Sequence, residues 1–86
     1  MTTLPPGGAA RQISLQVAPL NTKLTFLGVE GSPPLRRRLS ALGFRRGAPF
    51  EVVQRVSGGG RIVSIAGARI ALGRDLLASA FAEVAQ

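Results

Sequence analysis

The feature that most constrains the fold of this chain is a short helical pattern with both ends marked, within residues 32–47. Ser32 can accept hydrogen bonds from the first free amides of a helix, and Pro33 stands where a missing amide donor does least harm. Gly43 follows the last apolar position, and helices commonly end at a glycine in the left-handed conformation. The pattern therefore predicts one short helix between Ser32 and Gly43.

The apolar residues of this helix fall on one face. Leu35, Leu39 and Leu42 are spaced at i, i+4 and i+7, which stacks their side chains along one stripe. Phe44 directly after Gly43 is expected to fold back onto that stripe. We therefore expect the three leucines in the core, with one edge of the stripe able to remain open as a peptide groove.

Six further segments have the apolar spacing of strands and turn residues at their ends, namely residues 12–17, 23–29, 48–56, 61–66, 69–72 and 81–84. The first is either a short strand or an extended entry segment, whereas residues 73–80 are expected to form only a single 3₁₀-type turn begun near Asp75. The fold class predicted is mainly β: a small, partly open β-barrel of about five strands with one inserted α-helix.

The clearest strand is the segment 48–56. Phe50, Val52, Gln54 and Val56 alternate with Glu51, Val53 and Arg55, the period of a half-buried antiparallel strand. The glycine-rich stretch that follows, residues 57–60, predicts the turn of a hairpin with the segment 61–66. It does not predict a phosphate-binding loop, because such a loop leads into a helix and not into a strand.

Length and composition predict one domain. A chain of 86 residues has enough apolar residues, 45%, for one core, and too few residues for two stable cores. Residues 1–11 are rich in Pro, Gly and Ala and are expected to form a flexible tail, which leaves residues 12–86 as the domain. With four Phe, no Trp and no Tyr, the core is expected to be aliphatic.

The composition argues against most chemistry. The chain contains no Cys and no His, and its four acids are scattered: Glu30, Glu51, Asp75 and Glu83. The usual nitrogen and sulfur ligands of transition metals and the commonest general base are therefore missing. We expect a non-catalytic binding module with no metal site and no cofactor. No apolar run is long enough to span a bilayer, and the N-terminus does not resemble a signal peptide, so a cytoplasmic location is expected.

The net charge of +7 comes almost entirely from arginine, and five arginines surround the predicted helix. These are Arg36, Arg37, Arg38, Arg45 and Arg46. They are interpreted either as a solvated face, typical of an arginine-rich composition, or as a docking surface for an acidic partner or lipid headgroups. Nucleic-acid binding is less well supported, since base-stacking aromatic residues are not found beside them.

Several of these motifs together resemble the FeoA family of ferrous iron transport proteins. The similarity lies in the segments Leu35–Leu39, Leu42–Phe44, Gly47 and Phe50–Val53, and then in Ile70–Arg74 and Phe81–Val84. It extends over residues 15–85. The resemblance implies an SH3-like β-barrel with a helical insertion and no catalytic activity. It also implies a cytosolic accessory role in bacterial Fe(II) uptake, acting on the G-protein part of the FeoB membrane permease.

The chain also departs from the family pattern. The hairpin tip, residues 58–61, reads Gly-Gly-Gly-Arg where family members usually have a Gly-Asp-Pro-like sequence, so a partner contact at this tip must differ here or be absent. The same SH3-like domain occurs as an appendage of iron-dependent repressors, but no helix-turn-helix precedes it in this sequence.

Two hypotheses follow from the sequence. The first is an adaptor for the permease that uses the five arginines. The second is a small basic barrel that binds nucleic acid, or a domain related to the repressors. Exposed edge strands would also permit weak self-association.

Overall fold

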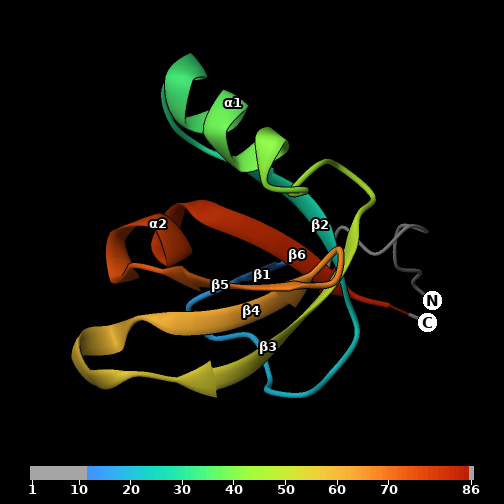
Figure 1. Ribbon diagram of the computed structural model, residues 1–86, viewed down its shortest axis with the longest axis vertical. Coiled ribbons are helices and arrows are strands. Elements are labelled where there is room, and N and C mark those ends of the chain that lie inside the picture. The colour runs from blue at the N-terminus through green and yellow to red at the C-terminus, as the bar shows by residue number, and fades with distance from the viewer. Residues whose placement is uncertain (1–11, 86) are drawn as a thin grey trace, which may run out of the picture.

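Six strands form a single antiparallel sheet in the order β1-β6-β2-β3-β4-β5. The structure is a computed structural model that describes residues 12–85, so the expected tail, residues 1–11, lies outside the described residues. The strands are β1 (Ile13–Ser14), β2 (Leu24–Val29), β3 (Pro49–Arg55), β4 (Arg61–Ile65), β5 (Ala68–Leu72) and β6 (Ala80–Val84). Figure 1 shows the strongly coiled sheet, with the helix α1 (Pro33–Ala41) standing at one end of it.

The predicted fold class is confirmed. All strand pairs of the sheet are antiparallel, the inserted helix lies between β2 and β3 in the chain, and the sheet remains open because β1 and β5 are its two outer strands. The first strand is shorter than the segment 12–17, since only Ile13 and Ser14 pair with β6. The chain then turns, with the Val17 amide donating to the Ser14 carbonyl at 3.1 Å.

The expectation of a single 3₁₀-type turn before the last strand is wrong. Residues Arg74–Ser79 form a second α-helix, α2, of 6 residues. Its Leu77 is fully buried, and the Leu77 amide donates to the Gly73 carbonyl at 3.0 Å. Burial of this leucine against the sheet stabilises a helix that would be too short to form by itself.

The alternation predicted along β3 also fails after Val52. Phe50 and Val52 are buried as expected, but Gln54 is exposed. The reason is a β-bulge: Val52 pairs with Val63, Gln54 pairs with Ile62, and the residue between them has no partner on β4. An extra residue on one strand reverses the faces of all residues that follow it.

The core contains an aromatic cluster, which corrects the expectation of an all-aliphatic interior. Phe26 on β2, Phe44 after α1 and Phe50 on β3 pack edge to face, with ring centroids 5.6, 5.9 and 6.3 Å apart. All three are buried, among aliphatic residues such as Leu24 and Val52. The cluster connects the chain that leaves α1 with two neighbouring strands of the sheet.

One arginine lies in the interior. Arg61 at the start of β4 is only 8% exposed, and its Nη1 donates to the carbonyl oxygen of buried Ala18 at 2.6 Å. Burial lowers the pKa of Arg61 from its ordinary value, and the positive charge of Arg55 lowers this pKa further. The hydrogen bond joins β4 to the connection between β1 and β2.

We expect Arg61→Met to lower the free energy of unfolding by about 1–3 kcal/mol, because the buried Ala18 carbonyl would lose its charged donor. Methionine retains an apolar stem, so the loss reports mainly on the hydrogen bond. The measurement is urea unfolding followed by circular dichroism. Arg55→Met is the matched control, since Arg55 is exposed and pairs with Arg61 across the two strands. Equal losses in the two variants would contradict this structural role.

Candidate docking surface

Helix α1 begins as the sequence predicted. The Ser32 hydroxyl accepts a hydrogen bond from the Leu35 amide at 3.4 Å, and the Ser32 carbonyl accepts one from the Arg36 amide at 3.1 Å. Pro33 and Pro34 occupy the first positions of the helix, whose amides have no partner within it. These local signals fix the start of α1 independently of the sheet.

The end of α1 is a Schellman motif that turns Phe44 into the core. The Gly43 amide donates to the Ser40 carbonyl at 3.0 Å, and the Phe44 amide donates to the Leu39 carbonyl at 2.9 Å. Gly43 has a φ of 107°, a conformation that favours glycine. The turn leaves Leu39 and Phe44 as the buried pair at this end of the helix.

The leucine stripe is only partly in the core, which corrects the prediction for two of its members. Leu39 is 4% exposed, as predicted, but Leu42 is 45% exposed and Leu35 is half-buried. Phe44, folded back by the Schellman motif, fills the interior beneath the helix. Because α1 stands out from the sheet (Figure 1), the outer leucines have no opposing layer to cover them fully.

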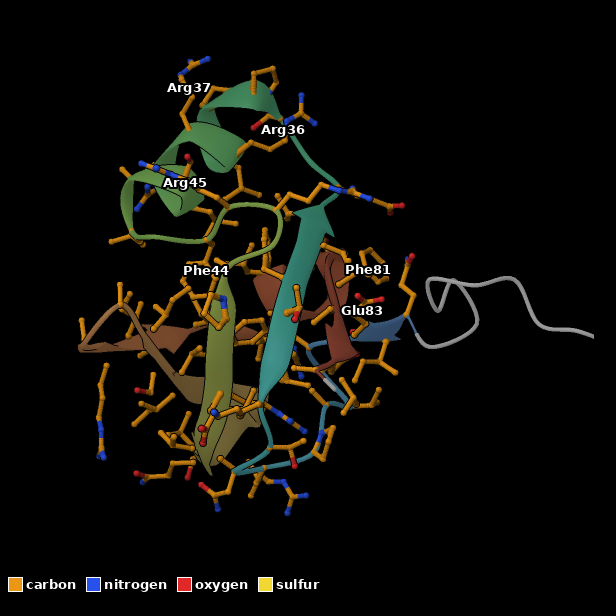
Figure 2. The ribbon with its side chains drawn as sticks, turned by 90° about the vertical axis from the view of Figure 1, so that its right-hand side faces the viewer. Arg36, Arg37, Phe44, Arg45, Phe81 and Glu83 are labelled. Carbon is orange, nitrogen blue, oxygen red and sulfur yellow. The ribbon has the colours of Figure 1, made fainter. Side chains whose placement is uncertain are left out.

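The structure places all five arginines of the predicted cluster in exposed positions: Arg36, Arg37, Arg38, Arg45 and Arg46. Figure 2 shows Arg36 and Arg37 extending from the far end of α1, away from the sheet, while Phe44 lies beneath the helix. Residues 31–50 contain no acidic residue. The helix and the turn after it therefore form one positively charged projection.

Three of these arginines also donate side-chain hydrogen bonds to backbone carbonyl oxygens. Arg36 Nη1 donates to the Gly31 carbonyl at 3.1 Å, Arg45 Nε to the Ser40 carbonyl at 3.4 Å, and Arg46 Nη1 to the Leu27 carbonyl at 3.3 Å. Because these contacts are exposed and satisfy only part of each guanidinium, the remaining donors face solvent. They can bind carboxylate or phosphate oxygens of another molecule.

A groove of about 200 Å³, lined mostly by aliphatic residues, separates α1 from the outer strand β5 and from α2. The helix contributes its exposed leucine edge, and the opposite wall is the end of β5 with the first turn of α2. Its lining residues are Leu35, Arg38, Leu39, Leu42, Ile70, Ala71, Leu72, Gly73 and Leu76. The open edge of the leucine stripe that the sequence predicted as a possible groove is thus one wall of this groove.

A second hollow, of about 230 Å³, lies on the outer face of β2 and β6. Leu27, Glu30, Arg46 and Phe81 are among its lining residues. Figure 2 shows Phe81 and Glu83 side by side on β6, below helix α1. Within residues 12–85, no group of three or more acidic side chains is close enough to hold a metal ion. The main surface features of the described residues are the positive projection, the groove beside α1 and the free edge of β5.

Sequence reasoning missed the buried arginine and one wall of the groove. Arg61 shares a strand face with Val63 and Ile65, and both of these are buried, so strand periodicity alone could have identified it. The sequence predicts a turn around Leu76, whereas its place in the groove depends on helix α2. No local signal could have revealed that β5 is the outermost strand of the sheet.

No helix within residues 12–85 is long and apolar enough to cross a membrane. Comparison with protein families gives a match to the FeoA domain over residues 12–84. A search of curated proteins gives no match.

Solved structures with a similar fold include three informative cases. An iron uptake regulatory protein (FeoA) is 24% identical, with a TM-score of 0.75, covering 84% of this chain and 96% of that chain. A FeoA protein from Chlorobium tepidum is 23% identical, with a TM-score of 0.78, covering 86% of this chain and 71% of that chain. A manganese-dependent transcriptional repressor is 18% identical, with a TM-score of 0.77, covering 96% of this chain and 44% of that chain. At these identities the likenesses concern the fold.

Proposed function

Since the chain belongs to the FeoA family of ferrous iron transport, we propose that it is a non-catalytic, cytoplasmic accessory protein of a FeoB-type permease. In this proposal the SH3-like domain docks on the G-protein region of the permease at its cytoplasmic face and modulates transport or assembly of the permease. The docking surface is the positive projection formed by α1 and the turn after it.

The observation that carries the proposal is the exposure of this projection. Arg36, Arg37, Arg38, Arg45 and Arg46 are all exposed, and no acid lies among them in the sequence from residue 31 to residue 50. Complementary charge accelerates encounter and fixes orientation more than it adds affinity. A surface of this kind suits an adaptor that associates with a larger partner and releases it again.

The direct test is a pull-down of the cytosolic domain of the cognate permease by this protein, together with Fe(II) uptake by cells that lack the gene. We expect capture of the domain and reduced uptake. Failure to capture the domain, with uptake unchanged in the deletion strain, would overturn the proposal.

A double charge reversal, Arg37→Glu with Arg38→Glu, is expected to slow association with the permease by about tenfold or more at low salt. It is expected to shift the melting temperature by no more than a few degrees, because both residues are exposed. The measurements are association kinetics at two salt concentrations and thermal unfolding. An unfolded double variant would show that these side chains support the fold and do not serve docking.

Nucleic-acid binding is the second candidate, favoured by the net charge of +7 and the isoelectric point near 12.0. Electrophoretic shifts of duplex DNA at two salt concentrations discriminate between the two candidates. Phosphate contacts release counterions, so genuine DNA binding must weaken steeply with added salt. A sequence-selective complex with that salt dependence would replace the adaptor proposal.

A further inference from the structure

The groove beside α1 runs along the open edge of β5. Three consecutive residues of this strand, Ile70, Ala71 and Leu72, line it together with the adjoining Gly73. Because successive side chains of a strand point to opposite faces, three consecutive strand residues can line one groove only where it follows the edge of the strand. Strand β5 ends the sheet order, and within residues 12–85 no other strand pairs with its outer edge.

The turn before β5 fixes which backbone groups face the groove. Ala66 and Gly67 both have positive φ, 52° and 81°, as in a two-residue type I′ hairpin turn. In such a turn Ile65 and Ala68 form a hydrogen-bonded pair, and hydrogen-bonded and non-bonded pairs then alternate along the ladder. Arg69 and Ala71 therefore direct their amides and carbonyls away from β4, toward the open edge.

The wall opposite this edge is apolar. Leu35 is half-buried and Leu42 is 45% exposed on the side of α1 that faces β5, and both line the groove together with Leu76 of α2. An extended segment that pairs with β5 would therefore place alternate side chains against an aliphatic surface. Backbone pairing with pockets for alternate side chains is the usual arrangement of strand addition to a sheet edge.

The charge of the groove indicates what kind of segment it binds. Arg38 is the one charged residue among the lining residues. Two further exposed arginines are close in sequence to the lining residues, Arg69 on β5 and Arg74 at the start of α2, and the acid Asp75 follows Arg74. A second copy of this chain would bring the same arginines and its own charge of +7 to the edge. An acidic segment would instead be attracted to it.

We propose that this groove binds an extended, acidic segment of the permease, which adds a strand to β5 and places an aliphatic side chain against Leu42. The inference rests on the proposed function, which supplies the partner, and goes beyond it by naming the surface and the chemistry of the bound segment. In this arrangement the positive projection would accelerate association with the permease, and the groove would slow dissociation of the bound segment.

The test measures the affinity of the full chain for the cognate permease in lipid nanodiscs. Ala71→Pro removes the amide at the open edge and leaves the pairing with β4 in place, and Ala71→Thr is its control because it keeps that amide. Leu42→Gln makes the helix wall polar, and Val17→Gln is its control, since Val17 is 69% exposed and lies in the connection between β1 and β2. We expect Ala71→Pro and Leu42→Gln each to weaken binding by about tenfold, and the two controls to bind as the wild type does.

The experiment separates failure of the groove proposal from failure of the proposed function. If the wild type binds and both Ala71→Pro and Leu42→Gln bind as tightly, the groove is not the binding site, and the proposed function still stands. Absence of wild-type binding would overturn the proposed function, and this inference with it. The last measurement is sedimentation of the chain alone. A dimer that Ala71→Pro abolishes would show that a second copy of the chain, and not a permease segment, pairs with the edge of β5. Circular dichroism of each variant verifies the fold, and an unfolded Ala71→Pro leaves Leu42→Gln to decide.

Discussion

Phe44→Ala is expected to lower the free energy of unfolding by about 3–5 kcal/mol, the largest effect of any single substitution proposed for this protein. Phe44 is 3% exposed and contacts both Phe26 and Phe50, with ring centroids 5.6 and 5.9 Å away. Alanine would leave a cavity bordered by two aromatic rings and remove both edge-to-face pairs. A domain of this size has a total stability of only about 4–13 kcal/mol, so the substitution removes a large fraction of it.

The matched control is Phe81→Ala. Phe81 is half-buried on the outer face of β6, between the buried residues Ala80 and Ala82, and Figure 2 shows it well apart from Phe44. Its removal creates no enclosed cavity, so we expect a smaller loss. Urea unfolding at constant temperature measures both variants. A loss for Phe44→Ala no greater than that for Phe81→Ala would contradict the aromatic cluster as the centre of the core.

Leu39→Ala is expected to cost about 2–5 kcal/mol, as for other buried leucines. Leu39 is the one buried residue of α1, and its carbonyl accepts the Phe44 amide in the turn that ends the helix. The substitution would therefore weaken the packing of α1 against the sheet and also disturb the position of Phe44 in the core. Far-ultraviolet circular dichroism should report lost helix as well as lost stability.

Leu42→Ala is the control for this second prediction. Leu42 is three residues further along the same stripe but 45% exposed, so its truncation should cost less than about 1 kcal/mol. Chemical denaturation of the two variants gives the comparison. Similar losses at both positions would mean that the whole leucine stripe is buried, as its periodicity alone predicts.

The comparison of Leu39 with Leu42 shows what the periodicity of apolar residues can and cannot predict. The i, i+4, i+7 spacing correctly predicts an amphipathic helix, because it reflects the geometry of the helix itself. It does not predict which part of the stripe is covered, because that depends on where the helix rests on the sheet. The same holds for β3, where the bulge after Val52 changes the face of Gln54.

The candidate docking surface likewise has one part that the sequence predicts and one part that it does not. The basic cluster could be predicted, since unpaired arginines are almost never fully buried, and these lie on a short helix and in the turn after it. The groove could not, because Leu42 and Ile70 are distant in sequence and meet only when α1 stands over the end of β5. The buried Arg61 lies between these cases: its strand periodicity marks it, but its hydrogen bond to Ala18 requires the assembled sheet.

By itself the sequence determined the helix and its two ends, the strand segments, the family and the absence of histidine and cysteine from the chain. These depend on capping, on turn residues and on periods of two and 3.6 residues, all of which act over a few neighbours. The tertiary structure alone decided the strand order, the aromatic cluster, the exposed half of the leucine stripe and the open edge of β5. These depend on contacts between residues far apart in the chain, whose energies no local pattern contains.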